Sequence, residues 1–526
     1  MFESAAASAL VPDLVDFAAA CRLDYATPLV AESASASPPS VGGECALGTH
    51  VLKDRQEDFE CLAAAVPRFA SMLLATEGDP DAPDIPTPRS YAEAITGPYS
   101  SQWQAAMDAE MASWKSTGTY VDEVPPPGAK IGDGMWIFRV KRPPGSPPAF
   151  KARCIARGFS QRQGVDYFQT FSPTPKMTTL RVLLHVAAQR DYELHSLDFS
   201  TANLQDSLHE EIWLRCPPGF TESFPAGTQW GLRRPVYGLR QAPHEWQDTL
   251  TTTLAALGFA PASADSSLFL RTNTLLPPFY VLVYVDDLVF ATADTEALTL
   301  VKSELQKRHT YTDLGELRSY LGLQITWDRA RRTITLTQSH MVHQVLQHFG
   351  FQFSLPQPTT LSTSHSLSAP PLYEFVEPSG HQKVHWDAAK RVLRYLCSTS
   401  GMGLVLGGRG PVVLTGHADA SWELRWLTYL LTDLGEQPCS PPVLYVDNKA
   451  MIALCQEHRL EHITKHIALR YFLARELQQC GQLRLAYMAT RANTADIFTK
   501  ALPPGDHQRF STVLGLVPTL PHLLTA

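Results

Sequence analysis

Apolar side chains recur along this chain in two periods, and the change from one to the other predicts where helices and strands lie. Between Trp103 and Trp114, large apolar residues return every three or four positions, which predicts a helix with one buried face. Two β-rich runs follow, Trp136–Val140 and Ala152–Ala156. The Pro- and Gly-containing segment Lys141–Pro148 between them predicts a hairpin loop.

Farther along, the same reasoning predicts a mixed succession of elements. Helices are expected at 178–190, 243–257, 294–308 and 340–349, and strands at Glu193–Phe199, Tyr320–Trp327 and Arg332–Gln338. At the centre, Phe279–Ala291 predicts a hairpin whose turn carries Asp286 and Asp287. This succession indicates an α+β fold for residues 100–350.

The C-terminal part alternates regularly between the two periods. We expect helix 386–398, strand Val412–Ala418, helix 423–433, strand Val443–Val446, helix 464–479 and strand Gln482–Met488. Such alternation is typical of a separate α/β domain, here 383–515. Two segments lack sustained periodicity. Residues 1–95 are acidic and rich in Ala, Ser and Pro, which predicts a disordered linker, and 351–382 predicts a second linker.

Composition excludes several classes of protein. With 526 residues the chain is long enough for roughly two to four domains. No run of eighteen apolar residues occurs, so no membrane-spanning helix is predicted. The start of the chain lacks the basic stretch of a signal peptide. Nine cysteines form no Cys-x-x-Cys pair, which favours a reducing compartment and argues against a zinc site.

The net charge of −8 looks unsuited to a nucleic-acid partner, but it is unevenly distributed. Residues 1–100 hold 5 Lys and Arg against 15 Asp and Glu, and the rest of the chain holds 39 against 37, a net charge of +2. Residues 139–181 contain one acid, Asp166, and nine cations: Arg139, Lys141, Arg142, Lys151, Arg153, Arg157, Arg162, Lys176 and Arg181. Such a cluster suits phosphate contact. The alternative is an ordinary solvated face.

Two adjacent carboxylates, Asp286 and Asp287, stand between apolar runs at the centre of the chain. Burying unpaired acids is unfavourable, so such a pair needs cations, and Mg²⁺ is the natural choice because it binds few carboxylates together with phosphates. Asp198, at the end of its own β-run, offers a third carboxylate. Three carboxylates and a basic cluster are what two-metal nucleotidyl transfer requires. The alternative is an exposed Asp-Asp turn.

Six motifs, in order and near the expected spacing, resemble the reverse transcriptase of copia-type retrotransposons. They are Phe-Lys-Ala-Arg-Cys-Ile-Ala-Arg-Gly-Phe-Ser-Gln (150–161), Gln-Thr-Phe-Ser-Pro (169–173), Leu-Asp-Phe-Ser-Thr-Ala (197–202), Val-Tyr-Gly-Leu-Arg-Gln-Ala-Pro (236–243), Tyr-Val-Asp-Asp (284–287) and Thr-Asp-Leu-Gly-Glu-Leu to Tyr-Leu-Gly-Leu (312–323). The resemblance covers residues 100–350. It implies a right-hand polymerase with fingers, palm and thumb.

The resemblance also implies roles for individual residues. Asp198, Asp286 and Asp287 match the family's catalytic, metal-binding aspartates, which hold two Mg²⁺ ions or alternatively Mn²⁺. The residues implied at the nucleotide are Lys151, Arg153, Asn203, Tyr237 and Gly238. Those implied to grip the primer end are Tyr320, Leu321 and Gly322. The implied partners are an RNA template, a DNA primer, their RNA–DNA hybrid and deoxynucleoside triphosphates.

Asn203 departs from the family pattern, which has an aromatic residue at this position. An aromatic ring there blocks the 2′-hydroxyl of a ribonucleotide, whereas asparagine is smaller and can hydrogen-bond that hydroxyl. We therefore expect weakened sugar discrimination, or poor activity.

The C-terminal domain resembles the RNase H that follows the polymerase in copia elements. Asp419, Asp447 and Asp496 each end or follow an apolar strand, although each alone also suits a strand-end or capping position. Only 27 residues separate Asp419 from Asp447, too few for a helix and two more strands. We expect an incomplete, degenerate fold without the catalytic glutamate, because Glu423 is expected to belong to the end of the helical run Glu423–Leu434 and not to the start that carries the glutamate. A second deletion falls near Gly380.

These observations support an RNA-directed DNA polymerase with an inactive RNase H-like region. The alternative is a decayed retroelement relic that binds nucleic acid weakly at most; an unrelated two-metal enzyme fits the surrounding motifs less well. We expect an intracellular location, in a cytoplasmic particle or the nucleus, without membrane attachment. Other products of a retroelement polyprotein are possible partners.

Overall fold

The computed structural model describes residues 85–141, 147–158, 161–164, 166–199, 208, 210–220, 227–360, 383–417, 421–456 and 469–519. Contacts divide these residues into two units. The larger unit contains Glu77–Leu336 and Leu404–Asn493, and the smaller one contains Thr337–Gly403 and Thr494–Ala526. The expected linkers therefore lie largely outside the described residues. None of the helices in the described part is long and apolar enough to cross a membrane.

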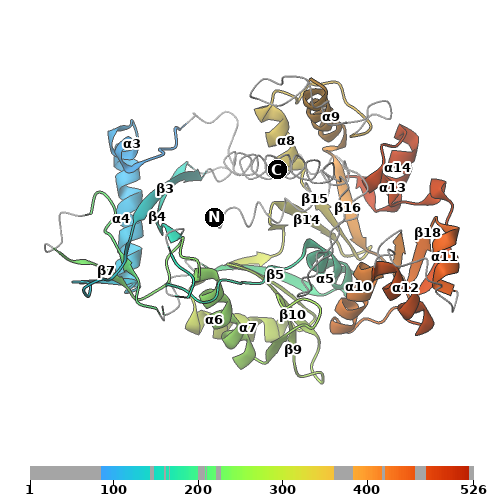
Figure 1. Cartoon of the computed structure of the whole chain (residues 1–526), viewed down its shortest axis with the longest axis horizontal. Coiled ribbons are helices and arrows are strands. Elements are labelled where there is room, and N and C mark those ends of the chain that lie inside the picture. The colour runs from blue at the N-terminus through green and yellow to red at the C-terminus, as the bar shows by residue number, and fades with distance from the viewer. Residues whose placement is uncertain are drawn as a thin grey trace, which may run out of the picture. The chain divides into compact units, whose positions relative to one another are not determined.

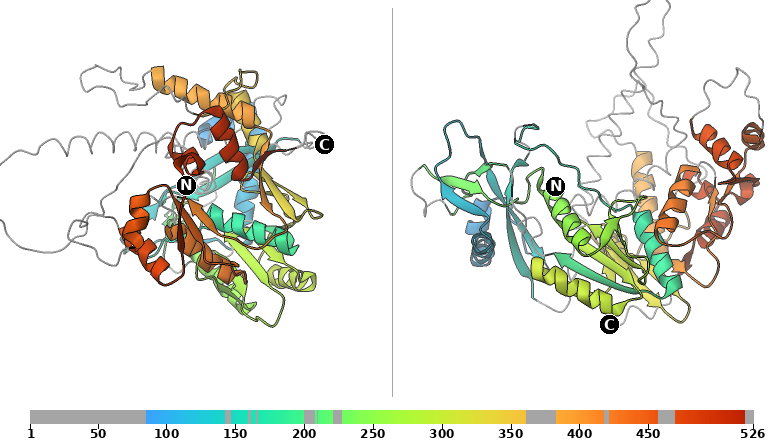
Figure 2. Two further views of the ribbon diagram at one scale, coloured as in Figure 1. Left: turned by 90° about the vertical axis from the view of Figure 1, so that its right-hand side faces the viewer. Right: turned by 90° about the horizontal axis from the view of Figure 1, so that it is seen from below.

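The larger unit mixes helices and strands (Figures 1 and 2). Its helices are α3 (Tyr91–Thr96), α4 (Ser100–Ser116), α5 (Met177–Arg190), α6 (Ala242–Ala256), α7 (Thr295–Arg308), α10 (Ser421–Asp433), α11 (Lys449–Gln456) and α12 (Leu469–Gln479). Its strands up to residue 271 are β1 (Tyr120–Glu123), β2 (Ile131–Gly132), β3 (Gly134–Lys141), β4 (Ala149–Ala156), β5 (Glu193–Phe199), β6 (Trp213–Leu214), β7 (Gln229–Leu232), β8 (Phe259–Pro261) and β9 (Leu268–Arg271).

The remaining strands of this unit belong to three sheets. They are β10 (Phe279–Tyr284), β11 (Asp287–Thr292), β12 (Tyr311–Glu316), β13 (Ser319–Tyr320), β14 (Leu323–Asp328), β15 (Thr333–Thr337), β16 (Met402–Gly407), β17 (Thr415–His417), β18 (Val443–Val446) and β19 (Arg484–Tyr487). Residues 404–407 of β16 pair antiparallel with β15.

A six-stranded antiparallel sheet in the order β12-β5-β11-β10-β9-β8 forms the centre of the larger unit. Alternate side chains of its inner strands, such as Leu197, Phe290 and Val281, are fully buried against α6 and α7. Successive residues of a strand point to opposite faces. Asp198 and Asp287 therefore face away from α6 and α7.

The N-terminal part of the unit is built on a second core. The β3–β4 hairpin packs on α4, and a small sheet in the order β1-β7-β6-β2 lies beside it. The predicted helical stripe is confirmed, because Trp103, Met107, Met111 and Trp114 are all buried in this core. Phe138 of β3 packs edge-on against the Trp103 ring.

The segment 404–493 contains a three-stranded parallel sheet in the order β17-β18-β19. Leu424, Leu444, Leu477 and Leu485 contribute to one apolar cluster beneath it. Within the described residues 421–442, a single helix, α10, and no strand connects β17 to β18. Glu423 lies in the first turn of this helix, so the expectation that it belongs to the end of the helical run is wrong.

The smaller unit contains α8 (Ser339–His348), α9 (Lys383–Thr399), α13 (Asp496–Thr499), α14 (Pro504–Val513) and β20 (Leu516–Pro518). Within it, α8 packs on α9. The ring of Tyr395 on α9 meets His507 of α14 edge-on.

Most central elements begin and end within two residues of their predicted bounds, and Glu193–Phe199 is identical. The predicted strand Tyr320–Trp327 is wrong in one respect, because a turn at Leu321 and Gly322 divides it into β13 and β14. The grouping of contacts also differs from the predicted domain boundaries. Residues 404–493 belong with the central sheet, and α8 belongs with α9.

Candidate active site

The two adjacent aspartates lie at a tight turn between the central strands of the sheet. β10 ends at Tyr284 and β11 begins at Asp287, so the turn contains only Val285 and Asp286. Val285 has a φ of 53°, which is unfavourable for a β-branched residue. Two hydrogen bonds hold this turn. The Trp246 indole donates to the Val285 carbonyl at 2.8 Å, and the Phe199 amide donates to the Asp286 carbonyl at 2.8 Å.

The third aspartate lies directly beside the other two. In the antiparallel pairing of β11 with β5, Asp287 is the register partner of Asp198. Directly opposed side chains on one face of such a pair have their Cβ atoms about 4.5–5.5 Å apart. The fold thus brings together carboxylates that stand 88 positions apart in the chain, from Asp198 to Asp286.

Burial, and after it the negative charge of the neighbouring carboxylates, raises the pKa values of Asp286 and Asp287. Burial and the negative charge of Asp198 raise the pKa of Asp286 from 3.8 to about 6, while Arg153 and Lys151 act in the opposite direction. Burial, Asp198 and Asp286 raise the pKa of Asp287 to about 7. Strongly raised carboxyl pKa values at one place are a mark of a functional site.

These donors suit a hard divalent cation. Asp286 Oδ1 is buried and has no hydrogen-bond partner among the described residues, so one acceptor is available for a cation. Within the same part of the chain, no three His, Cys, Asp or Glu side chains already converge closely enough to hold a metal ion by themselves. Mg²⁺ does not need such a cage, because it uses one or two carboxylates and completes its shell with water and substrate phosphates.

Two cations of the basic cluster reach the carboxylates from β4. Lys151 and Arg153 alternate with Phe150, Ala152 and Cys154, which pack toward the core. The charges of both cations lower the pKa of Asp286, so both lie within electrostatic range of it. The Arg153 guanidinium also stacks on the ring of Tyr237, 4.9 Å from its centroid.

Tyr237 belongs to the same cluster. The residue is 8% exposed, and burial followed by the negative charge of Asp286 raises its pKa. The predicted nucleotide residues Lys151, Arg153 and Tyr237 therefore lie together beside the aspartates.

Backbone contacts fix Tyr237 to the end of β4. The Ala156 amide donates to the Tyr237 carbonyl at 2.7 Å. A methyl group on Gly238 would overlap the Ala156 carbonyl oxygen, and one on Gly158 would overlap the Gly238 carbonyl oxygen. Gly238 also has a φ of 93°, which side chains rarely adopt. Both glycines are therefore required for this close approach.

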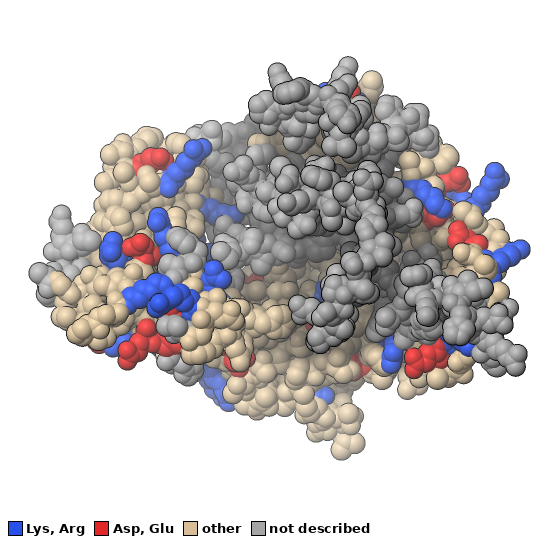
Figure 3. All heavy atoms as spheres, in the orientation of Figure 1, with Lys and Arg blue, Asp and Glu red and all other residues tan. Residues whose placement is uncertain are grey.

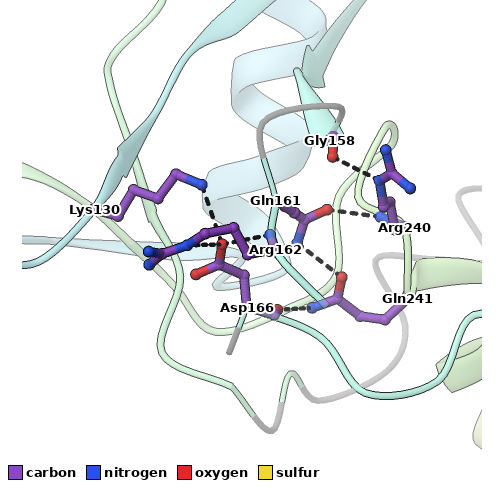
Figure 4. Close-up of polar contacts among 7 residues, drawn as sticks. All are labelled: Lys130, Gly158, Gln161, Arg162, Asp166, Arg240 and Gln241. Carbon is purple, nitrogen blue, oxygen red and sulfur yellow. Dashed lines mark hydrogen bonds and ion pairs between the residues drawn. The ribbon is translucent and has the colours of Figure 1, made fainter. Parts of the chain in front are cut away.

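Side-chain hydrogen bonds also join the segment after β4 to the residues that follow Gly238 (Figure 4). Sequence reasoning did not predict these hydrogen bonds. Gln241 is 1% exposed, and its amide oxygen accepts a hydrogen bond from Gln161 Nε2 at 3.0 Å. Gln161 Oε1 accepts from the Arg240 amide at 2.9 Å, and Arg240 Nε donates to the Gly158 carbonyl at 3.0 Å. Both glutamines stand inside the quoted motifs, but only the fold shows that they pair.

The predicted primer-gripping hairpin also lies at the site. Tyr320 pairs with Leu323, and Leu321 and Gly322 form the turn between them. Tyr320 is buried, and its pKa is raised by burial and by the nearby charge of Asp287. Its hydroxyl finds no hydrogen-bond partner in the described part of the chain. The hairpin thus lies near the aspartates through Tyr320 of β13.

The rest of the basic cluster is partly neutralised. Asp166 forms ion pairs with Lys130 and with Arg162. Nearby, Arg233 pairs with Glu123, and Figure 3 shows cationic and acidic side chains intermingled over the end of the larger unit that holds α3, α4 and β7. The cations expected at phosphate are therefore those near the aspartates, rather than the whole segment.

Four further residues that the sequence predicts for functional sites are placed as follows. Asn203 and Asp419 lie outside the described residues. Asp447 follows β18 in the larger unit and is partly exposed. Asp496 is 7% exposed and forms an ion pair with Lys500 at 2.9 Å in the smaller unit.

The raised pKa values make a prediction about stability. Because the folded protein binds protons more tightly at Asp286 and Asp287 than the unfolded chain does, the metal-free protein should lose stability as pH rises from about 4 to about 7. At pH 8, Asp287→Asn should raise the free energy of unfolding by on the order of 1–2 kcal/mol. Chemical unfolding with a chelator present measures this.

Magnesium should reverse the order of stability of the wild type and Asp287→Asn. Millimolar Mg²⁺ should stabilise the wild type by binding the folded state and should affect Asp287→Asn much less. Asp108→Asn, which changes an exposed carboxylate on α4, is the control and should behave as the wild type. A metal-free Asp287→Asn protein less stable than the wild type at pH 8 would contradict the assignment.

The chain is similar in sequence to known proteins of retroelements. Residues 119–361 match the model of the family described as reverse transcriptase (RNA-dependent DNA polymerase). The retrovirus-related Pol polyprotein from transposon RE2 of Arabidopsis thaliana is 28% identical over 92% of this chain and 38% of its own length. A putative transposon Ty5-1 protein of Saccharomyces cerevisiae is 30% identical over 43% of this chain and 83% of its own length.

A solved foamy viral protease-reverse transcriptase in complex with dsDNA gives a TM-score of 0.37 at 13% identity, covering 79% of this chain and 87% of that one. The chain spans 34–39% of the length of the plant polyproteins that it matches. From the matched family and these relatives, the chain belongs to the reverse transcriptases of copia-type retrotransposon Pol polyproteins.

Proposed function

We propose that the chain is an RNA-directed DNA polymerase that extends a DNA primer on an RNA template at the site formed by Asp198, Asp286 and Asp287. The observation that carries the proposal is the register of β5 against β11, which sets Asp198 opposite Asp287 next to the orphaned Asp286 oxygen. The central sheet would be the palm of a right-hand polymerase, and the β3–β4 hairpin its fingers.

The residues around the carboxylates would each have a separate role in nucleotidyl transfer. The three aspartates would hold two Mg²⁺ ions, which when bound supply Lewis-acid activation of the primer hydroxyl and neutralise the triphosphate. Lys151 and Arg153 would bind the triphosphate oxygens of the incoming nucleotide. Tyr237 would form the wall of its pocket. The β13–β14 hairpin would hold the primer end near Asp287, which aligns the attacking hydroxyl.

Primer extension tests the proposal. A labelled DNA primer annealed to an RNA template, with the four deoxynucleoside triphosphates and Mg²⁺, should be extended by the full chain and not by Asp286→Asn. Mn²⁺ in place of Mg²⁺ is a second arm, because it accepts the same oxygen ligands. Failure of the wild type to extend on any template would support the alternative, a retroelement relic without catalysis.

Asn203 supplies a prediction for the same assay. If asparagine leaves room for a 2′-hydroxyl, the wild type should incorporate ribonucleotides on the order of tenfold more readily than an Asn203→Phe variant, relative to deoxynucleotides. The ratio of kcat/KM for the two nucleotide classes measures this. Equal ratios in the two proteins would show that residue 203 does not set sugar selectivity.

We further propose that the RNase H-like region has no nuclease activity. The single helix between β17 and β18 supports this, because it leaves no room for the extra strands expected from the family. A labelled RNA–DNA hybrid should stay intact in the presence of the full chain and Mg²⁺. Hydrolysis that disappears in Asp447→Asn would refute this proposal.

A further inference from the structure

The segment 404–493 touches the central sheet through several polar contacts, of which the one from Tyr280 to Leu434 is buried and the others are partly buried or exposed. Contacts group this segment with the sheet, and the neighbouring α8 and α9 fall into the other unit. The contacts come from Trp426 and Asp433 of α10 and from the three residues that follow this helix. They reach two places on the sheet: the turn Ser263–Ser267 between β8 and β9, and the strand β10 with the nearby end of α5.

At the first place, α10 holds the turn Ser263–Ser267. The Asp433 carboxylate accepts hydrogen bonds from the Ser263 hydroxyl at 3.0 Å and from the Ala264 amide at 2.9 Å. The Trp426 indole donates to the Ala264 carbonyl at 2.7 Å. The ammonium group of Lys176, which precedes α5, lies over the Trp426 ring at 4.3 Å. The turn Ser263–Ser267 is therefore held by the Asp433 carboxylate and by the Trp426 indole.

At the second place, the chain after α10 meets β10 and α5. The buried hydroxyl of Tyr280 on β10 donates to the Leu434 carbonyl at 2.6 Å. The carboxylate of Glu436, whose side chain is 7% exposed, accepts two hydrogen bonds from Arg190, at 2.5 Å from Nε and 2.7 Å from the terminal nitrogen. A buried carboxylate of this kind is stable only while its partner is present.

Both places connect directly to the catalytic hairpin. The Ser267 carbonyl accepts from the Val283 amide at 2.9 Å, so the turn that α10 holds is bonded to β10 next to Tyr284. Tyr280 lies on β10 itself, and this strand ends at the turn with Val285 and Asp286. The contacts of α10 and the residues after it therefore act on the strand that carries the catalytic turn.

We propose that the segment 404–493 is a brace for the polymerase sheet: through Asp433, Leu434 and Glu436 it fixes β10 and so the position of the Asp286–Asp287 turn. The nuclease-like fold would be retained for this interface with its own chain. The proposal goes beyond nucleotide transfer, since it concerns how the sheet is held whether or not the site is active.

Hydrogen exchange in the full chain tests the brace. Removing one charge, as in Arg190→Met, leaves Glu436 buried without a partner and should speed exchange of the β10 amides at least about tenfold. The double variant Arg190→Met/Glu436→Leu removes both charges and should restore part of the protection, because the effects of contacting residues are not additive. Glu476→Gln, an exposed glutamate on α12 of the same segment, should leave β10 unchanged.

Asp433→Asn gives a milder test should Arg190→Met fail to fold. It should speed exchange at Ala264 and Val283 together. Exchange that rises only within 404–493, with β10 protected as in the wild type, would overturn the proposal. So would a double variant whose effect on β10 exchange equals the sum of the effects of Arg190→Met and of Glu436→Leu, each measured alone. Neither readout depends on polymerase activity, so a failure here and a failure of the proposed function are distinguishable.

Discussion

Asp287→Asn should lower the rate of nucleotide addition by at least about a hundredfold. The carboxylate lies opposite Asp198 in the β5–β11 register, so its loss removes one of the two acids that these strands present to each other. Asparagine keeps the shape and one oxygen but removes the charge that attracts a divalent cation. Single-turnover extension of a primer by one nucleotide measures the effect.

The stability of the same variant separates chemistry from folding. Because burial and neighbouring charges raise the pKa of Asp287 to about 7, the wild type carries repulsion at pH 8 that the variant lacks. We therefore expect a protein that is more stable without metal and yet inactive. Asp108→Asn should leave both properties unchanged. A variant with near wild-type addition rates would remove Asp287 from the chemistry.

Gly238→Ala should lower the free energy of unfolding by at least about 3 kcal/mol, or prevent folding. The new methyl group would overlap the Ala156 carbonyl oxygen, and the backbone would be strained at a φ of 93°. The atoms that the methyl group would meet all belong to the backbone of Ala156 and cannot turn aside, so the end of β4 and Tyr237 would have to separate. Chemical denaturation measures the change, and extension should fall with it because Arg153 no longer stacks on Tyr237.

Two matched variants separate the two causes of the expected loss of stability, steric overlap and backbone strain. Gly164 has a similar φ of 79° but no atom within 4 Å of the point that a methyl group would occupy, so Gly164→Ala should lose only about 1 kcal/mol from strain. Gly158→Ala introduces a clash with the Gly238 carbonyl at a backbone conformation open to other residues, so it isolates the overlap. If Gly238→Ala is no worse than Gly164→Ala, the close approach is not required.

Local patterns sufficed to predict the elements of the central sheet. The hairpin at Asp286 consists of two continuous apolar runs separated by the two aspartates, and Glu193–Phe199 is a short β-rich run, so their bounds follow from the sequence alone. The apolar pattern of Tyr320–Trp327 missed the turn because Leu321, with a φ of 49°, is apolar, and the only local turn signal is Gly322, with a φ of 78°.

The site was predicted only as far as the motifs name its residues. Asp198 and Asp287 were recognised as carboxylates, but their direct pairing depends on the order of strands in the sheet, which sequence patterns do not contain. The Gln161–Gln241 pair joins residues 80 positions apart, and Trp246 supports the turn from α6. Glutamine and tryptophan have many uses in proteins, so neither signals its role before the fold is known.

The contacts that group residues 404–493 with the central sheet were not predicted from the sequence. Alternating strands and helices in 404–493 indicate an α/β fold, and β17, β18 and β19 do form a parallel sheet. One contact between that segment and the central unit is the ion pair of Glu436 with Arg190, which stands 246 positions away. A charged residue beside a helical run is usually a solvated one, so the buried pairing was not predictable.

The rate of single-nucleotide addition as a function of Mg²⁺ concentration tests the central claim most directly. A DNA primer on an RNA template, one complementary deoxynucleoside triphosphate and rising Mg²⁺ should give no addition without metal and a rate that rises more steeply than a single binding site allows. Asp286→Asn should stay near zero at every concentration. Addition by Asp286→Asn at the wild-type rate, or no addition by the wild type at any concentration, would contradict a metal-dependent polymerase centre at Asp198, Asp286 and Asp287.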